Sequence, residues 1–574
     1  MAELQEGMDQ EKALEVLNTT VESQSNNLNP EDLERIRNQW LNSWAQIYAD
    51  PAALASALSD SAASGDWRLF FWQRDQVEQT QLETVQQELK KWFVADNRTN
   101  GLYIPTDSPQ RAPAASTPDV SSLLEGYTGK ESTDLTEVFD PSPQNINAST
   151  HIEVIELSQD LGQIKVALLP KPTRGDRVKA ILSVRFGDPE SLKGASFTGT
   201  ATADLLAHGT KKYSREQIED RFTQLQASVY FSGGANGVEV NIETTQDNLP
   251  EVIAFVSEIL REASFPETEL EKYKAQRLTR ISNARTEPSA IASQELGRHF
   301  NTWPKDDIRY TPSFDEAAER VTALNAADLT AFHQRFYGTG DIRFSATGSF
   351  NPDEVKAALQ KGFDNWRKAP EFERAADPYQ DIETAQLIFN TPDKANAFFI
   401  EMLPLNLQDT DPDYVPLYLA NYLLGQSETS RLWNRVRVTE GLSYDVRSRL
   451  NVSSYEPNAS WTIYAIHAPE NSQKLQEVIN EELNKVIEDG FSEQEVQEGI
   501  HALLRYRALA RANDGVLANT WQNYLDLDRD FLWAEKIDDA LQELNAEQVN
   551  AILRKHLKVD GFSSALAADQ SKQN

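Results

Sequence analysis

The sequence predicts an α+β protein in which one unit of helices and strands is repeated in tandem. Three amphipathic helical segments align with one another without gaps, at residues 80–93, 324–337 and 544–557. Each is followed by a strand-like run, and each is preceded by a pair of helices separated by a short break with an acidic turn. Strands and helices grouped in this way favour domains that each have a mostly antiparallel sheet with helices over one face.

The second and third copies also have a front half made of strands and a hairpin. The strand-like runs QIKVALLPKP (163–172) and VKAILSVRFGD (178–188) precede a hairpin whose turn is SGGANG, at 232–237. In the third copy, ANAFFIEMLP leads to a helix and then to the strand pair SYDVRSRLNV and SWTIYAIHA. The first copy has no such front half, so we expect the chain to begin inside a repeat.

A chain of 574 residues is too long for a single hydrophobic core. Prolines recur amid Ser, Thr and Asp between the first and second copies, which is typical of a connector. The predicted division is a mostly helical remnant of a preceding domain, a linker, a domain with a degraded metal motif and a C-terminal domain, at residues 1–105, 106–150, 151–375 and 376–574.

Composition excludes several classes of function. With 55 basic and 89 acidic residues the net charge is −34, which argues against nucleic acid or an anionic membrane surface as a partner. The absence of cysteine excludes thiol nucleophiles, disulfides and Cys-ligated metals. No apolar run approaches the ~18 residues of a membrane span, and the first residues are polar and acidic, without a secretory signal. We therefore expect no membrane insertion, and the compartment stays open.

Three stretches resemble the insulinase/pitrilysin family of zinc metallopeptidases, which are inverted zincins. IKVALLPKPTRGDRVKAILSVRFGDPESLKG (164–194) looks like the opening strands of a family domain, and GDWRLFFWQRD and NRTNGLYIPT look like the end of a preceding one. The order of elements is similar over essentially all residues. This resemblance implies the metallohydrolase fold shared with mitochondrial processing peptidase, and specifically the C-terminal, non-catalytic half of a bacterial four-domain member.

Active members of this family bind zinc with an H-x-x-E-H helix and a later glutamate, and the motif glutamate acts as general base. When the sequences are aligned on Gly209-Thr210, these four positions hold Thr200, Ala203, Asp204 and Arg280. Threonine cannot replace the imidazole, alanine removes the base, and arginine repels a divalent cation. We therefore predict that this chain binds no zinc, and that zinc belongs to a partner or to a missing N-terminal domain.

The family also carries an arginine and a tyrosine seven residues apart, which contact the substrate backbone and the tetrahedral intermediate. RLWNRVRVTEGLSYDV places Arg437 and Tyr444 at that spacing, with Gly441 at the turn. The resemblance implies that both donate hydrogen bonds to a substrate carbonyl. The alternative is that Arg437 forms a surface ion pair and Tyr444 packs in the core. His208, just before Gly209, is interpreted as a helix-end residue rather than a metal ligand.

Three functional hypotheses remain open. In the first, the chain is the substrate-binding, non-catalytic half or subunit of an insulinase-like zinc endopeptidase, and its partners are an extended peptide and a zinc-bearing domain. In the second, it is a pseudo-enzyme that binds peptides or supports assembly without any role in hydrolysis. In the third, Met1 is not the true start and the whole protein is an ordinary active protease. Bacterial relatives are often exported, so the resemblance is compatible with the periplasm.

Overall fold

The computed structural model describes residues 9–100, 124–127, 139–158 and 161–572. It begins with five helices, α1 (Gln10–Asn27), α2 (Pro30–Ala49), α3 (Pro51–Ala63), α4 (Leu69–Gln79) and α5 (Leu82–Trp92). Their starts follow from local sequence. Asn29 and Asp32 form a capping box at α2, and Asp50 caps α3 through the amides of the next residues. Pro30 and Pro51 occupy first-turn positions that need no amide donor.

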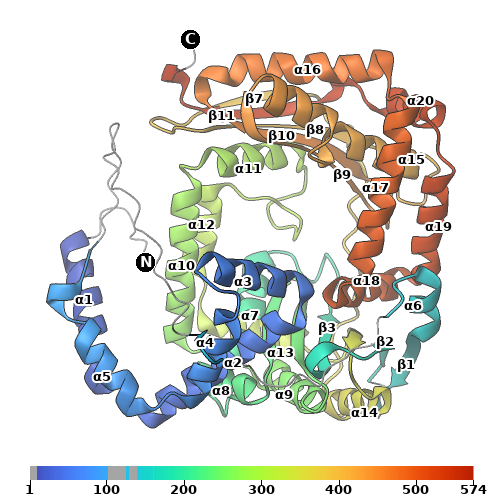
Figure 1. Cartoon of the computed structure of the whole chain (residues 1–574). Helices are drawn as coiled ribbons and strands as arrows, with labels where there is room; N and C mark the ends of the chain where they lie inside the picture. The colour runs from blue at the N-terminus through green and yellow to red at the C-terminus, as the bar shows by residue number, and fades with distance from the viewer. Residues whose placement is uncertain (1–8, 101–123, 128–138, 159–160, 573–574) are drawn as a thin grey trace.

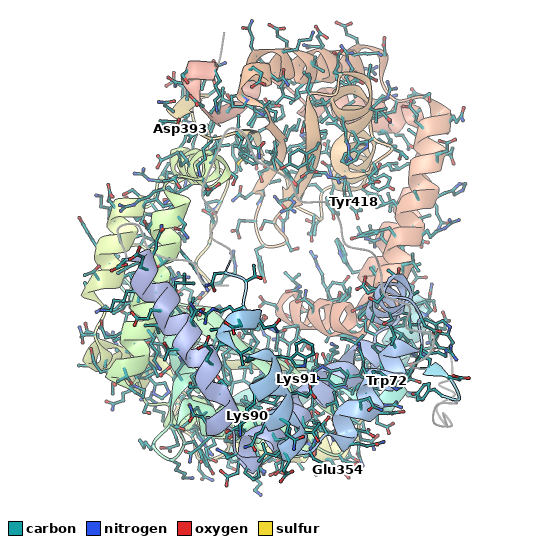
Figure 2. The ribbon with its side chains drawn as sticks, turned by 60° about the vertical axis from the view of Figure 1, so that its left-hand side comes forward. Trp72, Lys90, Lys91, Glu354, Asp393 and Tyr418 are labelled. Atoms are coloured by element: carbon teal, nitrogen blue, oxygen red, sulfur yellow. The ribbon has the colours of Figure 1, made fainter. Side chains whose placement is uncertain are left out.

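The N-terminal helices lie against the lobe of the first sheet and away from that of the second (Figures 1 and 2). Trp44 of α2 stacks on Phe70 of α4 with ring centroids 5.0 Å apart and donates its indole N–H to the Phe70 carbonyl. Among the residues that the structure describes, two hydrogen bonds connect these helices to the lobe that contains the first sheet. Asn42 donates to the Thr223 carbonyl, and Arg174 donates to the Tyr48 carbonyl. The predicted strand at 101–105 lies outside the described residues.

The first sheet has six strands in the order β1-β2-β6-β3-β5-β4. Strands β2 and β6 are parallel, and every other neighbouring pair is antiparallel. The predicted hairpin is confirmed, because β4 and β5 pair across the glycine-rich turn. The bounds are β1 His151–Glu156, β2 Gln163–Pro170, β3 Arg177–Arg185, β4 Ser228–Gly234, β5 Gly237–Thr245 and β6 Asp341–Gly348.

One face of this sheet buries a large apolar core under five helices. Alternate residues of β3, such as Val178 and Leu182, point into this core, as the period of two in a strand requires. The helices that cover it are α7 (Ser196–Leu205), α8 (Arg215–Gln224), α9 (Leu249–Glu262), α13 (Ala326–Phe336) and α14 (Pro352–Phe363). Beside them, α10 (Glu267–Ala284) and α12 (Phe314–Ala323) rise towards the other lobe (Figure 1).

The second sheet has five strands in the order β7-β11-β8-β10-β9. Its bounds are β7 Gln386–Asn390, β8 Ala397–Leu405, β9 Ser443–Val452, β10 Ala459–His467 and β11 Ser563–Ala568. The outer pair β7–β11 is parallel, as β2–β6 is in the first sheet, and the rest is antiparallel. Both sheets therefore share one topology, which confirms the duplicated α+β fold.

Helices of the C-terminal half cover one face of the second sheet and connect the lobes on the opposite side from α10 and α12 (Figure 1). They are α15 (Tyr414–Asn421), α16 (Ser472–Asp489), α17 (Glu493–Arg511), α18 (Asp514–Leu527), α19 (Phe531–Gln542) and α20 (Ala546–His556). Two π-helical segments, Tyr422–Gln426 and Trp433–Thr439, precede β9. Within the described residues, no helix is both long and apolar enough to cross a membrane.

The two halves exchange one helix each. Helix α18 packs on the second face of the first sheet, where Trp521 is fully buried against Ala167 and Leu169. In return, α11 (Pro288–Phe300) packs Ala292 and Leu296 on the second face of the second sheet. Each sheet is therefore covered on both faces, and on one of them by a helix from the other half. The short helix α6 (Pro143–Ser149) joins the α18 cluster through Ile146.

Candidate functional site

Three of the four predicted zinc positions lie on α7, where none of them is arranged as a ligand. The Thr200 hydroxyl donates a hydrogen bond to the Ser196 carbonyl, 2.9 Å away, so its donor is already used within the helix. Ala203 is fully buried. An ideal Cβ built on Gly233 of β4 would lie 2.9 Å from the Ala203 Cβ, which shows how closely the strand backbone approaches. The space that a general base would need at residue 203 is filled by β4.

Asp204 is held by groups of α10 rather than pointed towards a free site. The Tyr273 hydroxyl donates to Asp204 Oδ2 at 3.0 Å. Burial raises the pKa of Asp204 above its usual range, and the hydrogen bond from Tyr273 and the charges of Arg277 and Arg280 offset this only in part. Arg280 therefore places positive charge near the one carboxylate, where a zinc site would need another ligand.

The donor set at these positions does not fit zinc. A stable site takes about four ligands from His, Cys, Asp or Glu, whereas Thr200, Ala203 and Arg280 supply none and Asp204 supplies one carboxylate. Over the part of the chain that the structure describes, no group of three such residues could hold a metal ion. We derive no hydrolytic step through zinc in this chain.

His208 follows α7 in a short 3₁₀ turn, and its Nδ1 lies 3.3 Å from Glu269 Oε2. Burial lowers the pKa of His208, with a contribution from the nearby Arg215, and Glu269 opposes the shift. Glu269 also pairs with Lys272 and Arg215, so its charge is already shared. The imidazole is therefore mostly neutral at pH 7. Its interaction with the negative end of the helix dipole is weaker than that of a charged histidine.

Arg437 and Tyr444 lie on consecutive pieces of one segment. Arg437 belongs to the π-helical turn Trp433–Thr439, and its guanidinium lies 4.2 Å from the centre of the Trp433 ring. Tyr444 is the second residue of β9 and is 58% exposed. Between them, Gly441 has φ +65°, a left-handed conformation that glycine adopts without strain.

Both side chains are exposed to solvent. Tyr444 therefore does not pack in the core, which was the alternative left open by the sequence. In the described residues neither Arg437 nor Tyr444 makes a hydrogen bond or an ion pair. Their neighbours behave differently: Arg431 forms a bidentate pair with Glu495, and Arg435 bridges Glu440 and Glu481. Arg431 and Arg435 thus have structural roles in ion pairs with neighbouring helices and turns.

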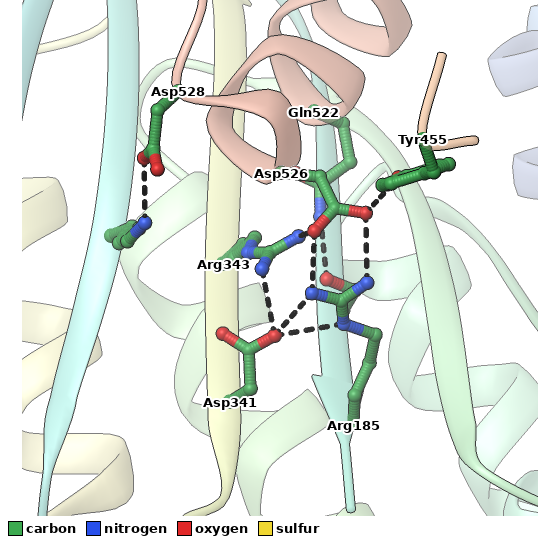
Figure 3. Close-up of polar contacts among 9 residues, drawn as sticks. Arg185, Asp341, Arg343, Tyr455, Gln522, Asp526 and Asp528 are labelled. Atoms are coloured by element: carbon green, nitrogen blue, oxygen red, sulfur yellow. Dashed lines mark hydrogen bonds and ion pairs between the residues drawn. The ribbon is translucent and has the colours of Figure 1, made fainter. Parts of the chain in front are cut away.

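Sequence patterns did not reveal the charged network between the halves (Figure 3). Asp526 at the end of α18 accepts from Arg185 Nη1 at 2.9 Å and Nη2 at 2.7 Å, and it pairs with Arg343. Asp341 bridges the same two arginines, and the Tyr455 hydroxyl donates to Asp526. Burial favours the neutral acid, but these donors outweigh it and lower the pKa of Asp526 to about 2.

Signals for this network exist only in three dimensions. Arg185 and Arg343 occupy neighbouring strands β3 and β6, where the register places Arg185 opposite Asp341. Asp526 is separated from Arg185 by 341 residues along the chain. No local pattern joins groups so far apart in sequence.

The two sheets of related strand order and the exchanged helices define a duplicated α+β protein. A family model described as the Peptidase M16 inactive domain matches residues 323–503. Residues 323–503 are thus similar to the M16 family, the insulinase/pitrilysin peptidases and their homologues, and the chain as a whole resembles members of this family.

Two relatives resemble this chain over most of their length. The "Non-peptidase homolog YmxG" of Helicobacter pylori is 20% identical over 394 residues, which are 68% of this chain and 89% of that protein. The "Uncharacterized zinc protease YmxG" of Bacillus subtilis is 22% identical over 369 residues, which are 63% of this chain and 86% of that protein. One relative is thus named a peptidase and the other a non-peptidase.

Solved structures share the fold. The Peptidase M16 inactive domain of Pseudomonas fluorescens has a TM-score of 0.64 at 19% identity and covers 74% of this chain and 99% of that one. The periplasmic protease PqqL of Escherichia coli has a TM-score of 0.56 at 15% identity, and the match covers 97% of this chain and 63% of PqqL.

Proposed function

We propose that this chain is the substrate-binding, non-catalytic half or subunit of an M16 zinc metalloendopeptidase. It would hold an extended peptide for hydrolysis by a zinc-bearing M16 domain supplied elsewhere. In this proposal residues 1–105 are the end of a preceding domain, 106–150 a linker, 151–375 a domain with a degraded zinc motif and 376–574 the domain that contributes Arg437 and Tyr444.

One observation carries this proposal: two exposed donors stand beside a sheet edge. Strand β9 pairs with β10 alone, so its outer edge is free of strand pairing in the described residues. A peptide can add to such an edge through main-chain hydrogen bonds. Tyr444 at the start of this strand and Arg437 in the π-helical turn before it supply a phenol and a guanidinium that can donate to a carbonyl oxygen of that peptide.

The geometry of Arg437 favours a binding role over a surface ion pair. Its guanidinium shares the Trp433 ring with that of Arg447, 4.3 Å from the ring centre. Stacking on an aromatic face fixes the planar group and leaves its N–H donors at the edge free. A preoriented donor loses less entropy when a peptide binds.

Peptide binding by the purified chain tests the proposal directly. We expect a fluorescently labelled unstructured peptide to bind about fivefold more weakly to Tyr444→Phe, because one hydrogen bond is worth about 1 kcal/mol. For Arg437→Ala we expect a loss of tenfold or more, since charge-assisted bonds are stronger. Tyr506→Phe is the matched control, because Tyr506 of α17 is 59% exposed. Equal binding by all three variants and the parent chain would exclude the proposed site.

The second candidate is a pseudo-enzyme that binds peptides or supports assembly and takes no part in hydrolysis. It is favoured by the name of the Helicobacter pylori relative. The two candidates differ in a reconstituted complex with a polypeptide that carries H-x-x-E-H. Under the first, Tyr444→Phe lowers kcat/KM of the complex; under the second, turnover does not depend on this chain. Zinc content, measured on the chain alone and on the complex, assigns the metal to one polypeptide.

A further inference from the structure

A buried carboxyl group without a partner lies at the base of a pocket in the second sheet, on β8, which β10 separates from the strand of Tyr444. Glu401 of β8 is 5% exposed, and its Oε1 is buried without a hydrogen-bond partner. The pocket has a volume of about 460 Å³ and lies between the strands and α16. Burial of a carboxyl group without a partner costs free energy. The ionised form loses its hydration, and the neutral form loses its hydrogen bonds to water.

Glu401 interrupts a row that is otherwise apolar. Alternate residues of β8 point into the core of the second sheet, and Phe399 and Leu403 on either side of Glu401 are both in that core. Strand β3 has the same place in the order of the first sheet that β8 has in the second. The residues of β3 that point into the core are all apolar. Packing alone therefore does not call for a glutamate at residue 401.

The carboxyl group is connected to the surface by a polar row across three strands. In the register of the sheet, Glu401 stands opposite Ser564 of β11, and Ser564 stands opposite Gln386 of the edge strand β7. Exposure increases along this row, from buried Glu401 through half-buried Ser564 to exposed Gln386. All three residues line the pocket, so a ligand can reach the acid from solvent.

Helix α16 forms the other wall and presents acceptors. Gln476, Asn480 and Asn484 are spaced four residues apart and line the pocket on one helix face. The side-chain amide of Gln476 donates to the Ser472 carbonyl at 3.1 Å, and that of Asn484 donates to the Asn480 carbonyl at 2.9 Å. One N–H of Gln476 and one of Asn484 are thus used within the helix, and the side-chain carbonyl oxygens of these two residues remain available as acceptors.

The corresponding place in the first half is filled. There α14 packs on α9, and a Cβ added to Gly362 would lie 2.8 Å from the Ser257 hydroxyl. Counting from Asn248 and Asn471, which cap α9 and α16, Ser257 corresponds to Asn480. In the described part of the chain no helix takes the place of α14 beside α16. The second half therefore has an open polar pocket where the first has packed helices.

We propose that this pocket binds a primary ammonium group, with Glu401 as its counter-ion and the amide oxygens of α16 as further acceptors. An ammonium has three N–H donors and no acceptor, which matches a carboxylate surrounded by carbonyl oxygens. The strongly acidic chain favours cations in general. The other ionisable residues that line the pocket, Lys558 and Asp560, are both exposed, and Lys558 donates to the Arg554 carbonyl.

Binding must ionise the acid, which gives a test that needs no mutation. Burial raises the pKa of Glu401 to about 8, so the group is mostly protonated at pH 7. An ammonium that pairs with the carboxylate therefore releases about one proton at pH 7 and binds about tenfold more tightly at pH 9. Titration calorimetry with butylamine, in two buffers of different ionisation enthalpy, measures both quantities on the full chain.

Three controls separate this site from general attraction to an acidic surface. Butyltrimethylammonium has the same charge but no N–H donors, so we expect it to bind at least tenfold more weakly. Glu401→Gln keeps the side-chain shape and is expected to abolish proton release and weaken butylamine binding at least tenfold. Asp560→Asn at the rim is expected to retain both. Equal affinity for the two amines, no proton release, or tighter saturable binding of Ca²⁺ than of butylamine would overturn the proposal.

Discussion

Single residues decide what each half of this molecule can hold. The side chain of Glu401 places an acid in an apolar row, and Ala203 occupies the position at which the family resemblance predicts a general base. Glu401 lines a polar pocket, whereas the backbone of β4 packs closely against Ala203. The sequence alone identified Thr200, Ala203, Asp204 and Arg280, because a motif with fixed spacing can be followed residue by residue. Glu401 was visible only as a glutamate in a strand, without a hint that it lacks a partner.

Replacement of Glu401 should stabilise the chain at alkaline pH. The pKa of this acid is about 8 in the folded chain against an ordinary 4.5, so the folded state binds more protons between these values. Its contribution to the free energy of unfolding therefore falls as pH rises from about 4.5 to 8. At pH 9 we expect Glu401→Gln to be more stable by a few kcal/mol, since one pKa unit is worth about 1.4 kcal/mol. Urea unfolding at pH 5, 7 and 9 measures this.

The control for that series is Asp560→Asn, which should keep the pH dependence of the parent chain because Asp560 is exposed. Parallel stability curves for the parent and Glu401→Gln would contradict the prediction.

Restoring the base on α7 should damage the fold rather than create a site. Ala203 is fully buried against β4, so Ala203→Glu buries a charge and overfills a packed contact. We expect the free energy of unfolding to drop by about 3 kcal/mol, with no gain in zinc affinity. The matched control is Ala275→Glu at an exposed position of α10, which should change stability by about 0.5 kcal/mol or less. A stable Ala203→Glu variant that binds zinc would contradict this prediction, because β4 would then have moved to make room for the glutamate.

At the scale of elements, local chemistry carried most of the prediction. Capping residues such as Ser492 and Asn545 start α17 and α20 where the sequence placed helices, and the turn of the β4–β5 hairpin lies in the glycine-rich run. The π-helical segments before β9 were not predicted. The π-helix is rare and appears mostly as single turns within α-helices, so a helical sequence pattern does not distinguish it from an α-helix.

The N-terminal helices are expected to be the least protected part of the chain. Helices α2, α3 and α5 contain no buried residue, and Trp92 of α5 is 52% exposed. Helical stability depends mainly on packing of an apolar face, and this face is uncovered. Hydrogen exchange followed by mass spectrometry should show residues 1–105 exchanging faster than 150–570. A partner that covers these helices should slow their exchange, whereas equal protection of both segments in the isolated chain would contradict the expectation.

At the scale of the whole molecule, the halves are held together by exchanged helices and by a partly buried charge network around Asp526. Helix α18 brings Trp521 into the core beneath the first sheet and carries Asp526 in its last turn, between Arg185 and Arg343. Buried ion pairs add little net stability, but they are costly to break, because the remaining charges stay buried. The network thus fixes how the C-terminal half docks on the first sheet.

Loss of the central carboxylate should weaken that docking. We expect Asp526→Asn to lower the free energy of unfolding by about 2 kcal/mol, because it leaves buried Arg343 and half-buried Arg185 with less compensating negative charge. Asp528→Asn is the control: this side chain is 83% exposed where it pairs with Lys165, so the change should be within about 0.5 kcal/mol. Chemical unfolding followed by near-ultraviolet circular dichroism measures both variants.

The pH dependence of the parent chain provides a second check on the network. The pKa of Asp526 is lowered from 3.8 to about 2, so its stabilising contribution is complete above pH 4. That contribution should be lost as pH falls from about 4 to 2. Asp526→Asn should lack this part of the acid transition, and an unchanged transition would count against the assigned role.

The sequence by itself determined the repeated α+β unit, the family resemblance, the altered zinc positions and the Arg437–Tyr444 spacing. These features depend on periodicity, capping and short motifs, which are local along the chain. Only the tertiary structure decided that α11 and α18 change places, that Asp526 meets Arg185 and Arg343, and that Glu401 lies unpaired beneath α16. Such contacts join residues far apart in sequence, and their energies depend on burial and on partners that no local pattern encodes.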